Sequence, residues 1–382
     1  MTELTEVPGI GSVAAKQLKN AYITTAELLA VQNADELHNK VKLGEGTCAN
    51  IILAAREMLG MFTFKSALEV EQENESKPRL KIGLENVDKQ LLGGLETGSL
   101  VEFYGKASGG KTQMCAHLAI RCQLPFDEGG IEGRVIWLDS ESSFKTSILR
   151  ANAKRWGLDP DVALGNIQTM AIVTSHHLEQ LFARIPQMCI EQGIKMVVVD
   201  SLTGFFRAEL GGLGSLAVRQ QRINRLLNHM RRVAMATDVM FVYSNQAISR
   251  PGIFSVPNAP VGGHIVSHAS DYRFMSTEGK SGKRKLYLKD HAGLPNFNVE
   301  FSIGWGGFYN SEDERKKIEP EVVEYLKSKD ICVEMQEKDK KKETKKVKKV
   351  KKTKETKKSK KAEAKAETNV KLEAEVASIV EG

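Results

Sequence analysis

One stretch, residues 100–113, sets the strongest limit on how this chain can fold. Leu100–Tyr104 alternates like a β-strand, Gly105–Thr112 fits the pattern G-x-x-x-x-G-K-[ST], and a helical pattern starts at Met114. Strand, glycine loop and helix in this order form a phosphate-binding loop, because backbone N–H groups then converge on phosphate oxygens at a helix N-terminus. The alternative is a glycine-rich turn that carries Lys-Thr by chance. The flanking strand and helix favour nucleotide binding.

The chemistry of such a loop assigns roles to its residues. Lys111 is expected to reach the β- and γ-phosphates of a nucleotide, and the Thr112 hydroxyl to bind Mg²⁺. The predicted nucleotide contacts are consecutive in the chain: Gly105, Lys106, Ala107, Ser108, Gly109, Gly110, Lys111, Thr112 and Gln113.

Residues 79–310 alternate strands with helices, which predicts an α/β core built on a mostly parallel, doubly wound sheet. Three apolar strands in this core lead into polar segments that contain, in chain order, Glu141, Asp200 and Gln246. In such sheets the ligand lies beyond the carboxyl ends of the strands. We therefore expect these side chains to meet the glycine loop at one edge.

Phosphoryl-transfer chemistry suggests what each of these residues does. Asp200 suits the carboxylate that helps to hold Mg²⁺. Glu141 can orient the attacking water or accept its proton, and Gln246 can donate to a γ-phosphate and so sense its presence. The alternative is that these residues only cap the next helix. As a set they predict a catalytic group of Glu141, Lys111 and Gln246, with Thr112 and Asp200 as metal ligands.

Residues 1–60 are predicted to form a small helical domain. Pro8-Gly9-Ile10-Gly11 precedes a helix that Ser12 can cap, and a second glycine turn at 43–47 precedes another helical run. This pattern is typical of a helix–hairpin–helix, whose exposed N–H groups can bind a DNA phosphate. Gly9 and Gly11 are therefore candidate DNA contacts. The alternative is an ordinary glycine turn in a helical bundle.

Residues 61–78 are predicted to be a linker, in which Phe64 and Ala67 precede Glu-rich sequence that cannot bury much. The isolated Phe64 needs an apolar pocket, either in the chain's own core or in a neighbouring subunit.

Two stretches without clear periodicity, 207–215 and 246–260, leave the predicted ligand edge. Long loops of this kind are usually functional or disordered, and each could change order with the nucleotide state. Their arginines, together with one in the helix that follows the first loop, suit a DNA backbone: Arg207, Arg219 and Arg250. For Arg219, the arginine in the helix, the alternative is a place on a solvated helix face.

The whole chain has 382 residues, a hydrophobic content of 41% and five cysteines without C-x-x-C spacing. These figures predict two or three units, with reduced thiols and neither a disulfide framework nor a zinc site. The N-terminus lacks the order of a signal peptide, and no apolar run approaches the roughly 18 residues of a membrane span. We expect a soluble protein of the cytoplasm that contacts no membrane.

Beyond residue 310 the sequence becomes charged. A charged extension, 311–337, carries one expected helix from Pro320 to Leu326. Residues 338–361 hold 15 lysines against three acidic residues, a surplus of twelve positive charges, which leaves −5 for the rest of a chain whose net charge is +7. We expect the Lys-rich tail, 338–382, to be disordered, and to hold DNA non-specifically by counterion release or to serve solubility.

With these residues placed, the sequence from about Glu6 to Asn310 resembles the RecA-like recombinases, most closely archaeal RadA and its eukaryotic strand-exchange relatives. Several phrases carry the likeness together: Leu92–Gly98, Val199–Thr203, Arg219–Gln221, Ser244–Gln246 and Val261–His264. The resemblance implies a RecA-like ATPase core with a helix–hairpin–helix domain before it. It also implies an ATP- and Mg²⁺-dependent filament on single-stranded DNA that exchanges strands with double-stranded DNA in recombination and repair.

The same resemblance implies roles for residues that composition leaves open. Asp290 and Pro295 match the cap that presses on the ATP of the adjacent subunit. His264 matches the residue that links ATP to the second DNA-binding loop, and Phe64 with Ala67 matches a motif that docks on the next protomer's sheet edge. A helical filament or ring of identical subunits, recombination mediators as partners, K⁺ at the subunit interface and, for an archaeal source, association with the nucleoid are further implications.

Four departures from the family pattern bear on the function, and one of them is the segment Asp290–Pro295, which differs inside the cap. Leu213 stands between two glycines where the first DNA-binding loop usually has arginine, Lys106-Ala107 replaces acidic and aromatic residues, and the stretch 144–148 lacks the arginine that stacks on adenine. The alternative function is a recombinase paralogue that binds ATP and DNA and modulates another recombinase's filament. A different RecA-type ATPase, such as a helicase, is a second alternative, for which the Pro8–Gly11 unit is unexpected.

Overall fold

The structure is a computed structural model that describes residues 1–209, 214–248, 259–260, 266, 268–278 and 284–331. The predicted DNA contact Arg250 and the predicted linking residue His264 lie outside the described residues, as does Leu213. No helix in these ranges is both long enough and apolar enough to cross a membrane.

The N-terminal segment is helical and has a hydrophobic core of its own. Its elements are the 3-10 helix η1 (Leu4–Glu6) and the helices α1 (Ser12–Asn20), α2 (Ala26–Ala30), α3 (Ala34–His38) and α4 (Glu45–Met58). Gly9 has a φ of +86° and Gly11 is the N-cap of α1, so the predicted glycine turn joins η1 to α1. Both glycines are exposed, which leaves the backbone of this turn accessible.

The polar segment predicted as a linker contains a helix, α5 (Ala67–Ser76). Ser66 caps it in a reciprocal arrangement with Glu69, and Lys65 forms a 2.6 Å ion pair with Glu73. None of its residues is buried. Local contacts therefore account for this helix, as expected for a capping box.

The core sheet has the strand order β12-β11-β10-β9-β3-β7-β6-β4-β5. The strands are β3 (Leu100–Gly105), β4 (Arg134–Asp139), β5 (Ile167–Ala171), β6 (Ile194–Asp200), β7 (Met240–Ile248), β9 (Tyr272–Glu278), β10 (Arg284–Asp290), β11 (Phe297–Gly304) and β12 (Gly307–Tyr309). Pairing is parallel from β9 through β5 and antiparallel from β9 to β12. The short strand β8 (Ala259–Pro260) pairs with β7, and β1 (Arg79–Leu80) pairs with β2 (Leu95–Glu96).

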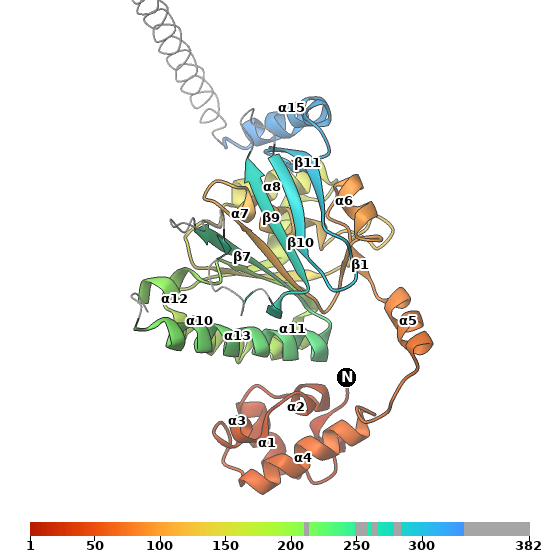
Figure 1. The fold of residues 1–382 in the computed structure, drawn as a ribbon, viewed down its shortest axis with the longest axis vertical. Helices are drawn as coiled ribbons and strands as arrows, with labels where there is room; N and C mark the ends of the chain where they lie inside the picture. Colours follow the sequence, from red (N-terminus) through yellow and green to blue (C-terminus); the bar gives the residue numbers. More distant parts are fainter. Residues whose placement is uncertain (210–213, 249–258, 261–265, 267, 279–283, 332–382) are drawn as a thin grey trace, which may run out of the picture. The chain divides into compact units, whose positions relative to one another are not determined.

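Helices cover both faces of this sheet (Figure 1). One hydrophobic core lies under α6 (Glu85–Gln90), α7 (Lys111–Arg121), α8 (Thr146–Arg155) and α9 (Pro160–Gly165). The other lies under α10 (Ser175–Phe182), α11 (Ile185–Gln192), α12 (Gly204–Glu209) and α13 (Leu216–Thr237). The predicted doubly wound, mostly parallel α/β fold is confirmed.

The last described helix, α15 (Glu312–Ser328), differs from the prediction. A helix was expected only from Pro320, but it begins eight residues earlier and contains this proline. Ser311 accepts the backbone N–H of Glu314, and acidic residues fill the first turn, where they interact favourably with the helix dipole. The N-terminal cap therefore decides where the helix starts.

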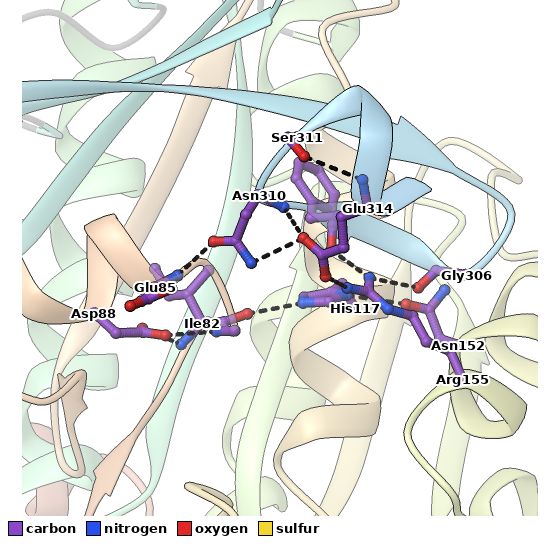
Figure 2. Close-up of polar contacts among 12 residues, drawn as sticks. Ile82, Glu85, Asp88, His117, Asn152, Arg155, Gly306, Asn310, Ser311 and Glu314 are labelled. Atoms are coloured by element: carbon purple, nitrogen blue, oxygen red, sulfur yellow. Dashed lines mark hydrogen bonds and ion pairs between the residues drawn. The ribbon is translucent and has the colours of Figure 1, made fainter. Parts of the chain in front are cut away.

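A polar cluster joins the helices α7 and α8 to the turn between β11 and β12 and to α15 (Figure 2). The ring of His117 contacts the Asn152 side chain at 3.0 Å and the Ile82 carbonyl at 2.8 Å. Arg155 donates to the Gly306 carbonyl and to Glu314, at 3.1 and 3.2 Å. The Arg155 guanidinium is thus paired inside the core, and the cluster has a structural role.

Candidate active site

The glycine loop lies between β3, which ends at Gly105, and α7, which begins at Lys111. Gly110 has a φ of +86°, and a Cβ on it would lie 2.6 Å from the Ile303 side chain. A Cβ on Gly105 would lie 2.5 Å from the carbonyl oxygen of Ser276. Only glycine fits these two positions, so β9 and β11 shape the loop from outside.

The Lys111 ammonium lies across this loop. Its Nζ donates to the carbonyl oxygens of Gly105 and Lys106, at 3.2 and 2.9 Å. Burial lowers the pKa of Lys111, while the carboxylates of Glu141 and Asp200 act in the opposite direction. The cation therefore faces two acidic groups in a partly desolvated site.

A pocket of about 390 Å³ opens beside the loop and gathers the predicted side chains. Its lining residues are Ala107, Ser108, Gly109, Gly110, Lys111, Thr112, Gln113, Glu141, Asp200, Ser244, Gln246 and Arg284. The strands β4, β6 and β7 bring Glu141, Asp200 and Gln246 to the end of β3 because all four run parallel. The structure thus places the predicted catalytic and metal-binding residues in one site.

Asp200 is almost fully buried and is held by two hydroxyl groups. Ser143 Oγ donates to one carboxylate oxygen at 2.8 Å, and Ser244 Oγ donates to the other. Asp139 accepts the backbone N–H groups of Glu141 and Ser143, at 3.2 and 3.1 Å, and so shapes the loop that carries Glu141. Sequence reasoning missed both serine contacts, since they depend on side chains of adjacent strands meeting at the sheet edge.

Glu141 is connected to the end of β7 and to the first predicted DNA-binding loop. Its Oε1 accepts a 2.6 Å hydrogen bond from Ser201 Oγ and a 3.0 Å bond from Gln246 Nε2. The Gln246 oxygen in turn accepts from Arg207 Nη1 at 2.8 Å. Arg207, predicted as a DNA contact, therefore lies one hydrogen bond away from the predicted γ-phosphate sensor.

Arg284 also lines the pocket, although sequence reasoning did not select it. It belongs to β10, and its Nη1 donates to the Ser108 carbonyl at 2.8 Å. The signal in the sequence was a basic hairpin turn. The position of β10 beyond β9 in the sheet brings that arginine to the glycine loop.

The donor set fits a nucleotide with Mg²⁺. The glycine positions leave no room for side chains where the backbone must approach a ligand, and the α7 N-terminus opens into the pocket. The hydroxyl of Thr112 and the carboxylate of Asp200 are oxygen ligands of the kind that Mg²⁺ prefers. Lys111 and Arg284 supply positive charge for phosphate oxygens.

The remaining predicted residues lie away from the pocket. Asp290 ends β10, is half-exposed and forms a 3.6 Å ion pair with Arg273, and Pro295 is exposed in the following loop. Phe64 is fully exposed, and Ala67 is the first residue of α5. Arg219 lies in the first turn of α13.

Comparisons with known proteins agree with this architecture. A family model described as Rad51 matches residues 75–311, and one described as a SAM-like helix-hairpin-helix tandem matches residues 1–57. A protein named DNA repair and recombination protein RadA from Aeropyrum pernix is 36% identical over 306 residues, which cover 80% of this chain and 96% of the relative. The protein of the same name from Metallosphaera sedula is 34% identical over 310 residues, 81% and 95% of the two chains. The resemblance seen in the sequence is thereby confirmed, and the chain belongs to the Rad51 family, as a relative of the RadA proteins.

Proposed function

We propose that this member of the family is an ATP-dependent recombinase that assembles on single-stranded DNA and exchanges strands in homologous recombination and repair. The observation that carries the proposal is the convergence of Lys111, Glu141, Asp200 and Gln246 on one pocket at the ends of parallel strands. The relatives' name, DNA repair and recombination protein, supports the biological setting.

Hydrolysis of ATP follows from the chemistry of this pocket. The backbone of the glycine loop and Lys111 bind the phosphates, and Mg²⁺ bound at Thr112 and Asp200 would neutralise charge on phosphate oxygens. Glu141 orients water toward the γ-phosphate and accepts its proton. Ser201 and Gln246 fix the direction of the Glu141 carboxylate through their hydrogen bonds, at 2.6 and 3.0 Å.

DNA binding is coupled to this site through α12. Arg207 is exposed on that helix and bonds to Gln246, so a γ-phosphate that attracts the Gln246 amide changes the partners available to Arg207. The first predicted DNA-binding stretch, 207–215, begins within α12. In this scheme DNA and ATP bias the same side-chain pair, which is the requirement for coupling between two sites.

Assembly is supported by two exposed features. Phe64 is 100% exposed, so it adds nothing to the core of its own chain and is available to a second copy. Strand β5 ends the sheet order and pairs only with β4 among the described strands, with Met170 and Val173 exposed at or beside this edge. An extended Phe64 segment of the next protomer adds to this edge by main-chain pairing, and Asp290 then reaches the neighbour's ATP.

A displacement-loop assay with ATP and Mg²⁺ tests the proposal. The protein should form joint molecules between single-stranded DNA and a homologous duplex, and Lys111→Ala should abolish them. If the unmodified protein binds single-stranded DNA yet yields no joint molecules, strand exchange is the wrong function. A modulating paralogue then becomes the better description, as Leu213 in the first DNA-binding loop would suggest.

A further inference from the structure

A row of polar side chains crosses four neighbouring strands of the core sheet, β7, β3, β9 and β10, and its members on the first three are buried. Asn245 on β7 donates to Glu102 Oε1 on β3 at 2.8 Å. Arg273 on β9 donates from Nε to Glu102 Oε2 at 2.9 Å, and its Nη1 lies 3.6 Å from Asp290 Oδ2 on β10. The row thus begins beside Gln246 and ends at Asp290.

The strand register puts these side chains together. Glu102 and Arg273 are direct partners in the parallel pairing of β3 with β9, and Arg273 and Asp290 are direct partners in the antiparallel pairing of β9 with β10. Directly opposed residues share a face of the sheet, so the three side chains form a line across it. This line runs perpendicular to the strands, from the centre of the sheet outward.

Because Glu102 and Arg273 are buried, separating them would be costly. Glu102 is completely buried, and the Arg273 side chain is 10% exposed. Burial raises the pKa of Glu102, and Arg273 and Asn245 counteract this by charge and hydrogen bonding. A buried carboxylate that lost this partner would be left uncompensated, so Arg273 is held in one place.

The same row reaches the first predicted DNA-binding loop. Thr203 Oγ1 donates to the Asn245 oxygen at 2.8 Å, and Thr203 immediately precedes α12, the helix that carries Arg207. Asn245 and Gln246 are consecutive in β7 and point to opposite faces of the strand. One short piece of backbone therefore carries both a contact to Glu141 and a contact to the Glu102–Arg273 pair.

We propose that Glu102 and Arg273 are positioning residues that hold Asp290 against the ATP of the adjacent protomer and connect it, through Asn245, to the protomer's own γ-phosphate sensor. The inference rests on the proposed function, because only an assembled chain has an adjacent ATP. Its consequence is that a defect in the pair raises the KM for ATP at the neighbour's active site, which Asp290 closes.

Mixed assemblies test this directional consequence. In Arg273→Lys, the ammonium keeps the positive charge but cannot bridge Glu102 and Asp290 at once, and in Glu102→Gln the anchor of Arg273 is weakened. We expect either variant alone to show DNA-stimulated hydrolysis with a KM for ATP raised about tenfold, as for the loss of one hydrogen bond to a charged group. Lys111→Ala subunits are expected to hydrolyse no ATP, and they carry an intact Asp290.

Adding Lys111→Ala subunits to Arg273→Lys subunits in equal amounts should therefore restore a low KM at the Arg273→Lys sites that they cap. Asp290→Asn should be rescued in the same way. Arg231→Gln is the matched control, since Arg231 forms a 2.6 Å ion pair with Asp271 that does not lead to Asp290. That variant should keep the wild-type KM, alone or mixed.

Thermal unfolding first establishes that each variant is folded. If the wild type hydrolyses ATP in a DNA-dependent manner but the mixed assemblies show no rescue, the inference is overturned. If Arg273→Lys does not fold, Glu102→Gln decides the question by the same mixing experiment. A wild-type protein without DNA-dependent hydrolysis or self-assembly would overturn both the proposed function and this inference.

Discussion

The Gln246 side-chain amide donates a 3.0 Å hydrogen bond to Oε1 of Glu141, the same oxygen that accepts a 2.6 Å bond from Ser201. One carboxylate oxygen is therefore fixed by two donors. Glu141 lines the pocket beside Lys111. Because Gln246 belongs to the end of β7, the orientation of the Glu141 carboxylate depends on that strand end. A γ-phosphate that engages Gln246 would free part of this carboxylate for water.

Glu141→Gln should separate binding of ATP from its hydrolysis. The amide cannot accept a proton, so we expect kcat to fall by about 10²–10⁴-fold, the usual contribution of a general base. Binding of a fluorescent ATP analogue should change little, because the loop and Lys111 are intact. Steady-state hydrolysis with and without single-stranded DNA measures the effect. A variant that retains wild-type kcat would show that Glu141 is not the base.

Gly110→Ala should abolish nucleotide binding without unfolding the protein. The added methyl group would meet the Ile303 side chain at 2.6 Å, in a backbone conformation that alanine rarely adopts. The loop must then shift away from the phosphates. Titration with the fluorescent analogue should show at least a tenfold loss of affinity, which corresponds to about 1.4 kcal/mol.

Gly165→Ala is the matched control for that change. A Cβ on Gly165 meets no atom within 4 Å, and its φ is not in the left-handed region. We expect this variant to bind nucleotide like the wild type. Equal losses in both variants would mean that the loop geometry does not limit binding.

Phe64→Ala should leave the protein as monomers, because the exposed ring is the proposed contact to the next protomer. Its thermal unfolding should be unchanged, since the side chain buries no area in its own chain. Light scattering with ATP and single-stranded DNA measures the size of the assembly. Phe126, 54% exposed on the core, is a control whose change to alanine should leave assembly intact. Filaments formed by Phe64→Ala would refute the assigned role.

Because of His117, the free energy of unfolding should fall as the pH is lowered below about 6.5. Burial, assisted by the positive charges of Arg155 and Arg121, lowers the pKa of His117 to about 3, from an ordinary histidine value of about 6.5. Between these values the unfolded chain binds a proton that the folded chain does not. The free energy of unfolding therefore falls as the pH falls through this window, by about 1.4 kcal/mol per pH unit from this residue.

Denaturant unfolding at several pH values between 4 and 7 measures this dependence. In His117→Gln the amide keeps polar contacts to Asn152 and Ile82 and loses the titration, so the slope should decrease. The exposed His176 provides the control, and His176→Gln should retain the wild-type slope. A slope that His117→Gln leaves unchanged would place the titration elsewhere.

Local sequence signals were sufficient for the glycine loop and for the strand-end residues Glu141, Asp200 and Gln246. Their pattern is contained in short segments, and parallel pairing brings the ends of those segments to one edge. The start of α15 was predicted wrongly because the helix was expected to begin at Pro320, whereas Ser311 caps it nine residues before that proline.

Contacts between segments that are distant in the sequence could not be predicted from local sequence patterns. Arg284 reaches Ser108 across 176 positions, and Arg273 reaches Glu102 across 171. Both depend on the order of strands β10, β9 and β3 in the sheet, which hydrophobic periodicity does not specify. The sequence therefore predicted which strand-end side chains meet at one pocket but not the side formed by the antiparallel strands.

Helix α5 buries none of its side chains and is held by its own capping box and ion pair. An α-helix rises about 1.5 Å and rotates about 100° per residue. The ten residues of α5 therefore set both the distance and the rotation about the helix axis, here called the phase, between Ala67 and the chain that leads to β1. One inserted residue turns that phase by about 100°, whereas seven residues, close to two full turns, restore it. In an assembly joined through Phe64, the number of residues in this solvent-exposed helix would then determine the rotation between neighbouring subunits.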